Sequence, residues 1–492
     1  MTANNQDIRD FVWNRTDFFE NRYRKGIAAV VASYKFISEH HPLNYSPEER
    51  EFLSLYHRIK NLPGEVFSHV WQEPLAYAWS VTIYNRLSVL DMVRLRANTW
   101  HDQQQADTAE MVESQLYSQL DFFKLFVIGV IYLAKESIVF ERTFKIALPF
   151  SIPGTGLVIR GDHHAEIISI TDSVLKLKKD DDIFEINLDK DPVAILQPVR
   201  LEKCPLITSH NTHFYLNPFS SRFPYFETLD GEYAAAAPQA ISYDEIEAIE
   251  SALALFKRFY PEGFDQFCKW TRVLATKSPY ARGVGSTTNT ELPGLITLML
   301  PCSRIWLAET FVHEYFHQRL FFLDEETPIM EEIPGPSIYY QPWRWDARPP
   351  LGLIHAIFVF TPVAKFFLNM YKSREFNGTE LYYIADFAVR TSVRLQIGID
   401  NLGKIDDFTE NGLQLLGILK HEIECYVKEV KKTDLNLDMP AMEFSKQKNS
   451  YSPQLGIRDN KPMTVREALI EHIEHSEAGE KSKHWVEIIR QY

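Results

Sequence analysis

Hydrophobic residues recur at helical spacing through the first third of the chain. The segment 46–49 (Ser-Pro-Glu-Glu) has the form of a capping box with proline at the first helical position. An apolar stripe with the period of a helix follows it and stops at a Pro-Gly pair at 63–64. The same spacing predicts further helices from Pro74 to about Leu95 and over about 107–136.

The period of the pattern changes to two between about Phe144 and Leu216. Turn-forming Pro-Gly, Gly-Asp and Lys-Lys-Asp-Asp-Asp sequences separate short alternating runs at 144–146, 165–170, 174–178 and 183–188. Alternation bounded by such turns is typical of antiparallel hairpins. His163 and His164 fall in one of these turns, where we expect them to be solvated.

Helical spacing returns after Tyr243, interrupted by a short apolar strand at 295–300. The long amphipathic segments lie at 303–326, 350–373, 379–402 and 408–431. The stretch 432–462 is polar and rich in Lys, Asn and Pro, which predicts a loop or linker, and Thr464 opens a terminal helix with a second capping box.

The predicted fold is α+β and mostly helical, with an antiparallel β-hairpin region between an N-terminal helical part and a C-terminal helical part. The predicted regions are an N-terminal helical region (1–140), an antiparallel β region (141–240), a helical metal-binding domain (241–435) and a linker with a terminal helix (436–492). No internal repeat is visible.

Composition narrows the class of protein. Of 492 residues, 45% are apolar and 24% charged, which is typical of a globular protein. The 66 acidic residues exceed the 52 basic ones, giving a net charge of −14, so nucleic acid and anionic membrane surfaces are poor candidate partners.

Cysteine usage and the apolar runs bear on location. The four cysteines, at positions 204, 268, 302 and 425, form no C-x-x-C pair, so neither a disulfide framework nor a thiolate zinc site is indicated. The N-terminus lacks the apolar core of a signal peptide, and the longest uninterrupted apolar run, Leu125 to Ala134, is too short to span a membrane. We therefore expect a cytoplasmic protein.

The motif with the clearest chemistry is His313-Glu314-Tyr-Phe-His317, an H-E-x-x-H sequence. Because Ser303 can cap a helix that continues through the motif, the two histidines fall on one helical face and can chelate one divalent ion. Glu314 projects about 100° away, where it can act as a base on metal-bound water or orient a ligand. The alternative is a buried helix with two hydrogen-bonded histidines.

Possible third ligands differ between classes of metalloprotein. The metzincin pattern fails because Leu320 and Leu323 occupy its next positions. A carboxylate ligand from a following helix, as in other zinc peptidases, would have to be Glu331 or Glu332, but a helix-hostile Pro-Gly-Pro segment comes directly after them.

Two further candidates follow the motif. Asp346 lies between Arg344 and Arg348, so an ion pair is the simpler account of it. His355 lies in the apolar segment 351–360, and it is the favoured third ligand because the two-histidine half-site lacks a partner. The two arginines offer planar forks for bidentate binding of a carboxylate, or are surface arginines on an interaction loop.

Taken together, these residues resemble a bacterial family of H-E-x-x-H proteins. The shared positions are Leu292-Pro-Gly294, Ala308-Glu309, the motif itself, Pro342-Trp-Arg344, Arg348-Pro349, Gly352 and His355, within about 275–375. Members of the family occur with ribosomally made peptide natural products and are described as 2-oxoglutarate-dependent peptide β-hydroxylases. Phe360 departs from members that carry a histidine there.

The resemblance implies an Fe(II) site formed by His313, His317 and His355, with open positions for 2-oxoglutarate and O2. It also implies that Arg344 or Arg348 binds the distal carboxylate of 2-oxoglutarate. The expected reaction hydroxylates the β-carbon of a residue in a precursor peptide and converts 2-oxoglutarate to succinate.

Two other functions stay open. One is a zinc metallopeptidase with Glu314 as the general base and Glu331 or Glu332 completing the site. The other is a non-catalytic peptide-binding partner. In either hydroxylase or binding protein, the N-terminal helices and the hairpin region are expected to recruit the peptide, by adding a strand to an edge of the 144–216 sheet.

Overall fold

The structure is a computed structural model of the 492-residue chain. It describes residues 17–40, 45–100, 116, 120–147, 150–161, 164–190, 199–203, 206–209, 212–216, 242–277, 286–288, 290, 292–300, 302–331, 338–447, 450–458 and 461–491.

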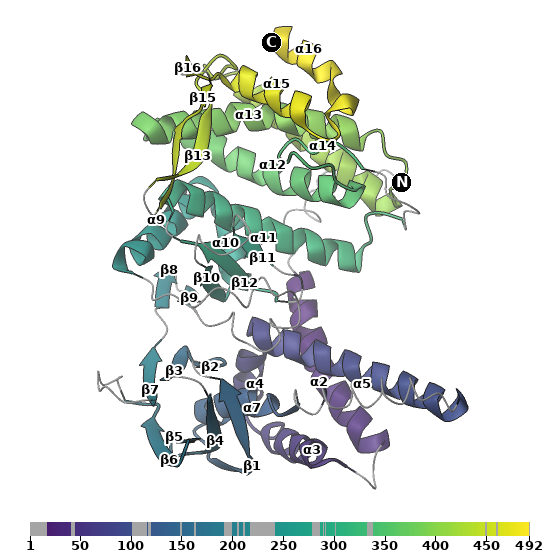
Figure 1. The fold of residues 1–492 in the computed structure, drawn as a ribbon, viewed down its shortest axis with the longest axis vertical. Coiled ribbons are helices and arrows are strands. Elements are labelled where there is room, and N and C mark those ends of the chain that lie inside the picture. Colours follow the sequence, from purple (N-terminus) through teal and green to yellow (C-terminus); the bar gives the residue numbers. More distant parts are fainter. Residues whose placement is uncertain are drawn as a thin grey trace.

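Two lobes, each with its own hydrophobic core, are stacked along the long axis of the molecule (Figure 1). The N-terminal lobe is built on a core that extends from Val30 to Leu188. The C-terminal lobe is built on a larger core, which extends from Ile249 to Ile489 and also takes in Tyr23. The predicted helical region 1–140 and the predicted β region 141–240 thus contribute to one core rather than two.

The N-terminal lobe begins with helices whose ends are set by capping. They are α2 (Asp17–His40), α3 (Pro47–Ile59), α4 (Gly64–Trp71), α5 (Pro74–Trp100) and α7 (Phe123–Leu133). The predicted capping box is present, because the Ser46 side chain accepts from the Glu49 amide and the Glu49 side chain accepts from the Ser46 amide. The helix predicted over 107–136 falls largely outside the described residues, apart from α7 and single positions before it.

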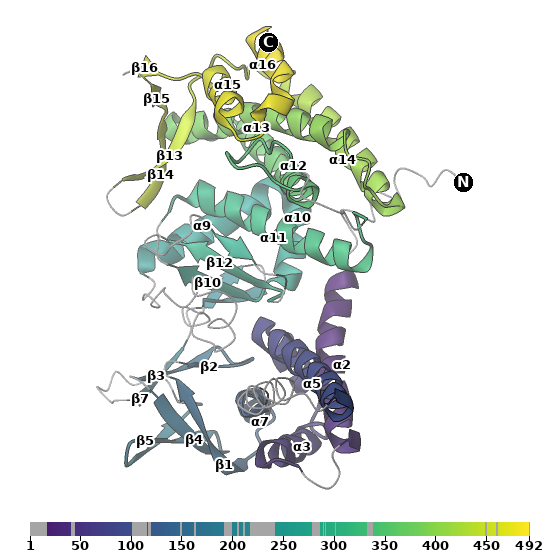
Figure 2. The same ribbon diagram turned by 45° about the vertical axis from the view of Figure 1, so that its right-hand side comes forward.

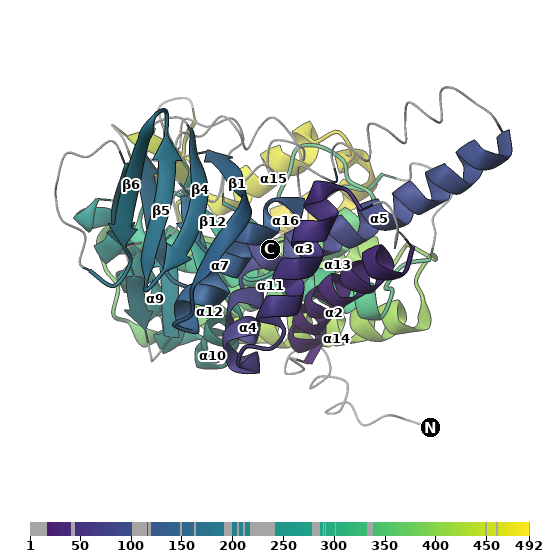
Figure 3. The ribbon, with the colours of Figure 1, turned by 90° about the horizontal axis from the view of Figure 1, so that it is seen from below.

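Alternating strands form two antiparallel sheets in this lobe. The first has the order β1-β4-β5-β6, with β1 (Ile138–Ala147), β4 (His164–Thr171), β5 (Val174–Lys179) and β6 (Asp182–Asn187). The second has the order β2-β3-β7, with β2 (Phe150–Ile152), β3 (Leu157–Gly161) and β7 (Val199–Lys203). Seen from below, the first sheet lies beside helices α2 to α7 (Figure 3). The predicted hairpins are confirmed, but they do not form one continuous sheet.

A five-stranded mixed sheet lies at the base of the C-terminal lobe. Its order is β11-β12-β10-β9-β8, with β8 (Leu206–Ser209), β9 (Thr212–Leu216), β10 (Val273–Lys277), β11 (Thr287–Thr288) and β12 (Leu295–Met299). The predicted strand at 295–300 is therefore present as β12. It pairs in parallel with β10, whereas the sequence pattern predicted antiparallel hairpins only.

Helices in successive layers make up most of the C-terminal lobe (Figure 2). They are α9 (Tyr243–Phe259), α10 (Pro261–Trp270), α11 (Arg304–Glu326), α12 (Pro350–Ser373), α13 (Gly378–Leu402) and α14 (Glu410–Val430). The amphipathic segments predicted from 303 to 431 match the last four within a few residues. The predicted class, α+β and mostly helical with antiparallel sheets, is confirmed.

The C-terminal segment packs on α13 and is part of the second core. Its elements are β13 (Met442–Gln447), β14 (Ser450–Leu455), β15 (Ile457–Arg458), β16 (Lys461–Pro462), α15 (Val465–His475), η3 (Gly479–Ser482) and α16 (His484–Gln491). The prediction of a loop over 432–462 was wrong for β13 and β14, which form an antiparallel hairpin of six residue pairs. Their polar sequence lacks the apolar alternation by which a strand is predicted. The capping box at Thr464 is present.

Helix α12 is long and apolar enough to cross a membrane by length and composition. In the part of the chain that the structure describes, it is the one helix of that kind, and 72% of its apolar window is buried inside the protein. It lies between α11 and α13, which is the position of a core helix (Figure 2).

Candidate metal and carboxylate site

Helix α11 presents the two histidines of the motif on one face, as their spacing predicts. Ser303 caps the helix by accepting from the amide of Trp306. The Nε2 atoms of His313 and His317 are 3.1 Å apart, and the ring centroids are separated by 4.7 Å. Nitrogens that bind one ion at about 2.1 Å lie roughly 3.0–3.4 Å from each other, so this pair has the separation of two ligands of a single ion.

The third histidine comes from α12, which crosses the same face of α11 in the opposite direction. The Nδ1 atom of His355 lies 3.4 Å from Nδ1 of His317, and the two rings are nearly parallel. The ring of Phe321, one turn beyond His317, packs against both imidazoles. The structure thus brings together all three histidines that the sequence singled out.

The three imidazoles lie in a row, with His317 in the middle, and do not surround a common point. His317 meets His313 with Nε2 and His355 with Nδ1, so its two neighbours lie at different nitrogens of its ring. Among the residues that the structure describes, no group of three or more His, Cys, Asp or Glu side chains has the geometry to hold a metal ion. The geometry fits two imidazole ligands, and His355 is a third imidazole in contact with them.

Electrostatics keeps these imidazoles in the form that binds metals. Burial lowers the pKa of His313 and of His355 to about 4. Burial, assisted by charge on His313 and His355, lowers the pKa of His317 well below its ordinary value. All three are therefore neutral at neutral pH, and a neutral imidazole offers a lone pair to a divalent ion.

Glu309 lies one turn before His313 on the same helical face. Its Oε1 atom is 3.7 Å from Nδ1 of His313, and that nitrogen is buried with no hydrogen-bond partner. Burial raises the pKa of Glu309 to about 8. A carboxylate at this position commonly orients a metal-binding histidine. Its signal in the sequence is the i−4 spacing from His313, which lies outside the H-E-x-x-H motif.

Glu314, the predicted catalytic residue, is buried with 5% of its surface exposed. It is rotated by about 100° around α11 from His313, and it has an interaction partner of its own. Its role as a base stays a prediction.

The two loop arginines bind a carboxylate of the protein itself. Arg344 Nε is 2.7 Å from one oxygen of Asp346, and Arg348 Nη2 is 2.7 Å from the other. The hydrogen bond from Arg344 lowers the pKa of Asp346. The ion pair predicted as the simpler account of Asp346 is therefore present in the structure. Binding of 2-oxoglutarate by either arginine stays a prediction.

Trp343, from the same loop, reaches the histidine site through Phe360. Its indole stacks on Phe360 with centroids 4.5 Å apart, and the other side of Phe360 packs edge-on against the His313 ring at 4.9 Å. Phe360, the position that departs from the family pattern, thus fills the space between Trp343 and His313 with a ring that cannot bind metal.

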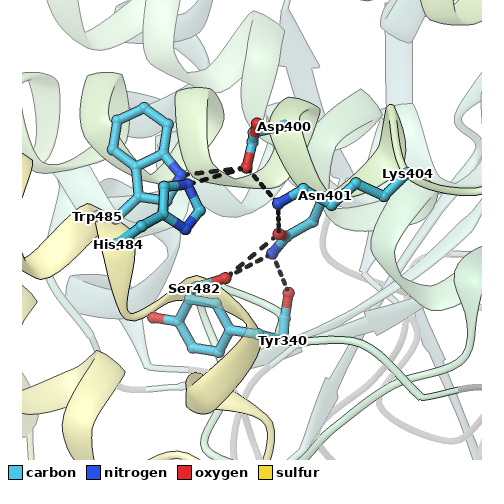
Figure 4. Close-up of polar contacts among 7 residues, drawn as sticks. All are labelled: Tyr340, Asp400, Asn401, Lys404, Ser482, His484 and Trp485. Atoms are coloured by element: carbon cyan, nitrogen blue, oxygen red, sulfur yellow. Dashed lines mark hydrogen bonds and ion pairs between the residues drawn. The ribbon is translucent and has the colours of Figure 1, made fainter.

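Hydrogen bonds connect the start of this loop, at Tyr340, to α13 and to the C-terminal segment (Figure 4). The amide of Asn401 donates to the carbonyl of Tyr340 and to Ser482, at 3.2 and 2.9 Å. Asp400 accepts from the indole of Trp485. The segment predicted as a linker and terminal helix therefore holds the loop that carries Trp343 and the two arginines.

Of the two carboxylates considered for a peptidase, the described one, Glu331, lies away from the motif. Glu331 is exposed and follows the end of α11, where its amide donates to the carbonyl of Asp407. The helix from His313 to its last residue Glu326 is about 20 Å long, so Glu331 follows the far end of the helix from the motif. Glu332 lies outside the described residues.

Comparison with family models finds no match for this chain, and comparison with curated proteins finds none either. The resemblance to peptide β-hydroxylases therefore rests on the motif residues alone.

Proposed function

We propose that this chain is an iron- and 2-oxoglutarate-dependent hydroxylase that acts on the β-carbon of a residue in a ribosomally made peptide. The observation that carries the proposal is the contact of three neutral imidazoles across α11 and α12, at the positions where the resemblance expects ligands. A set of imidazoles without a thiolate suits iron as well as zinc. The separation of Glu331 from the motif weighs against the peptidase.

In this proposal His313 and His317 hold the metal, and His355 is the nearest further donor. The metal, with O2 and 2-oxoglutarate, supplies the oxidising power for hydroxylation. Glu309 orients the imidazole of His313 through the Nδ1 side of its ring, and the Trp343–Phe360 stack excludes water from one side of the site. We place the reaction in the cytoplasm.

The substrate is proposed to bind through the N-terminal lobe. The first sheet ends in edge strands β1 and β6, and Ile183 in β6 is 64% exposed. Strand addition at β6 would give a peptide main-chain hydrogen bonds without demanding a particular sequence. Protection of 182–187 from hydrogen exchange when peptide is added would support this; unchanged exchange there would contradict it.

Product analysis tests the reaction. The chain is purified without oxygen, loaded with Fe(II) and incubated with 2-oxoglutarate and the short peptides encoded in neighbouring genes. We expect a peptide heavier by one oxygen atom, formed together with succinate. Cleaved peptide in the presence of zinc would instead identify a peptidase, and unmodified but tightly bound peptide would identify a non-catalytic partner.

A further inference from the structure

Solvent reaches the middle of α11 at three positions. Within residues 307–323, His313, His317 and Phe321 are partly exposed, and every other residue is buried. Because the three follow one another at intervals of four residues, they form a single stripe along the helix. The surface that α11 offers to solvent here therefore consists of two imidazoles and one phenyl ring.

Helix α12 adds one imidazole and one phenyl ring to this stripe. Within residues 353–364, His355 and Phe360 are partly exposed, and every other residue is buried. The ring of Phe360 packs edge-on against His313, with centroids 4.9 Å apart. The ring of His355 packs against Phe321 at 4.7 Å. These side chains form one continuous surface, the imidazole–phenyl patch, whose members are His313, His317, Phe321, His355 and Phe360.

Two further aromatic rings fix the position of Phe360 at one end of the patch. The indole of Trp343 stacks on Phe360 with centroids 4.5 Å apart and planes inclined by 1°, and Phe387 of α13 packs against it at 6.4 Å. At the other end, Phe321 packs against the two imidazoles that Phe360 does not touch. A side chain that lies beside the imidazoles therefore meets the carbon surface of a phenyl ring at both ends of the patch.

Charged groups next to the patch are covered or already bonded. The carboxyl of Glu309 lies 3.7 Å from Nδ1 of His313, but the Glu309 side chain is only 11% exposed. Asp324, the next partly exposed residue of α11 after Phe321, accepts from the amide of Ile329. Apart from Glu309, no residue in the described part of the chain forms a hydrogen bond or an ion pair with the side chains of the patch. A charged or amide side chain bound here would therefore lose water without gaining a protein partner, whereas an apolar side chain has no hydrogen bond to lose.

We propose that the imidazole–phenyl patch receives an apolar side chain of the peptide, so that the residue that is modified is aliphatic or aromatic. This inference rests on the proposed function and names the class of residue on which it acts. Phe321 and Phe360 determine the specificity, because they are the two members of the patch that offer only carbon surface. Each methylene group that they cover should raise the affinity about fourfold.

Paramagnetic broadening in nuclear magnetic resonance tests which side chain lies at the patch, without any turnover. The full chain is loaded with Mn(II) in the absence of oxygen and titrated with two capped pentapeptides, which carry either Leu or Asn between glycines. The two guest side chains have nearly the same shape, but the amide of Asn must be desolvated. We expect the dissociation constant obtained from the broadening of the guest protons to be about 10-fold lower for the Leu peptide. The broadening should be absent in His317→Ala.

Substitutions of the two phenyl rings assign the preference to the patch. Phe360→Asn and Phe321→Asn replace carbon surface with an amide, so the preference for Leu should decrease several-fold, whereas the conservative Phe360→Leu should keep it. The matched control is Phe67→Asn, because Phe67 is a partly buried aromatic residue of the N-terminal lobe that stacks on Trp71. Circular dichroism verifies that each variant is folded.

Four results would overturn the proposal. They are equal affinity for the two peptides, broadening that persists in His317→Ala, a Leu preference that survives both Phe360→Asn and Phe321→Asn, and a preference that is lost in Phe67→Asn.

Product analysis separates this inference from the proposed function. If the preference for Leu depends on the patch but no peptide is hydroxylated, the apolar site stands and the hydroxylase proposal fails. If a peptide is hydroxylated at a charged or amide-bearing residue, the hydroxylase proposal stands and the apolar site fails.

Discussion

The two lobes differ in whether a buried cation has an ion-pair partner. In the N-terminal lobe, Lys124 is 1% exposed, and its Nζ atom lies 2.7 Å from Glu51 Oε2, 3.3 Å from Asp121 and 3.1 Å from the carbonyl of Arg142. In the C-terminal lobe, Arg394 has no such partner among the described residues, and Asp386 is already bound to Arg390. One cation is compensated by described side chains, whereas the other makes no hydrogen bond or ion pair with a described residue.

The same contrast applies to the neutral groups around them. The indole of Trp71, in the N-terminal core, donates to Ser80 at 3.0 Å. The indole of Trp343, beside the histidines, donates to no described residue. Unsatisfied polar atoms are costly, and the indole of Trp343 stacks on Phe360, which packs against His313.

The largest expected effect is loss of metal from the C-terminal lobe. Replacing His317 with Ala removes the imidazole that contacts both other histidines, so we expect iron binding and hydroxylation to be abolished. Metal analysis after gel filtration measures the first and mass spectrometry of the peptide the second. The control is His164→Ala, an exposed histidine of the N-terminal lobe. Equal metal content in wild type and His317→Ala would disprove the assignment.

Removal of the compensated cation should have the next largest effect. Lys124→Met leaves Glu51 buried without its partner, so we expect a loss of about 3–5 kcal/mol in the free energy of unfolding. Urea unfolding followed by circular dichroism measures it. Arg394→Met is the matched comparison in the other lobe, and equal destabilisation by both substitutions would remove the distinction between the lobes.

Acid should destabilise the C-terminal lobe through His472. The folded pKa is about 3 and the unfolded value about 6.5, so between these limits the unfolded chain binds the extra proton. Stability therefore rises with pH across this window, by up to roughly 1.4 kcal/mol per unit from this one group. Unfolding at several pH values should show a shallower slope in His472→Gln.

The control for this experiment is His475→Gln, because His475 is exposed on the same helix. If wild type and His472→Gln showed the same slope, His472 would be charged in the fold.

The smallest expected effect concerns the loop arginines. The side chains of Arg344, Asp346 and Arg348 are 54%, 43% and 37% exposed, and exposed ion pairs contribute about 0–1 kcal/mol. Asp346→Asn should therefore change the free energy of unfolding by less than about 1 kcal/mol. A change of several kcal/mol in thermal or urea unfolding would show that this ion pair holds the loop in place.

Local signals predicted much of the fold and half of the site. The caps at Ser46, Ser303 and Thr464 and the i, i+4 spacing of His313 and His317 are determined within a few residues, so they can be read from the sequence. The alternation in β4 and β5 belongs to the same class of signal.

Tertiary features could not be predicted in this way. Arg394 lies in an ordinary amphipathic pattern, and its lack of a partner depends on Arg390 and Met442 meeting Asp386. The hairpin β13–β14 is stabilised by pairing and by contact with α13 rather than by an apolar alternation. His355 was identified only because the half-site needed a partner.

Absorption spectroscopy during anaerobic addition of Fe(II) and then 2-oxoglutarate tests the central claim most directly. If the histidines of α11 and α12 hold iron that binds 2-oxoglutarate, wild type should develop a visible absorption band. The band should be absent in His317→Ala. Stoichiometric zinc after both aerobic and anaerobic purification, with no band in wild type, would contradict the account.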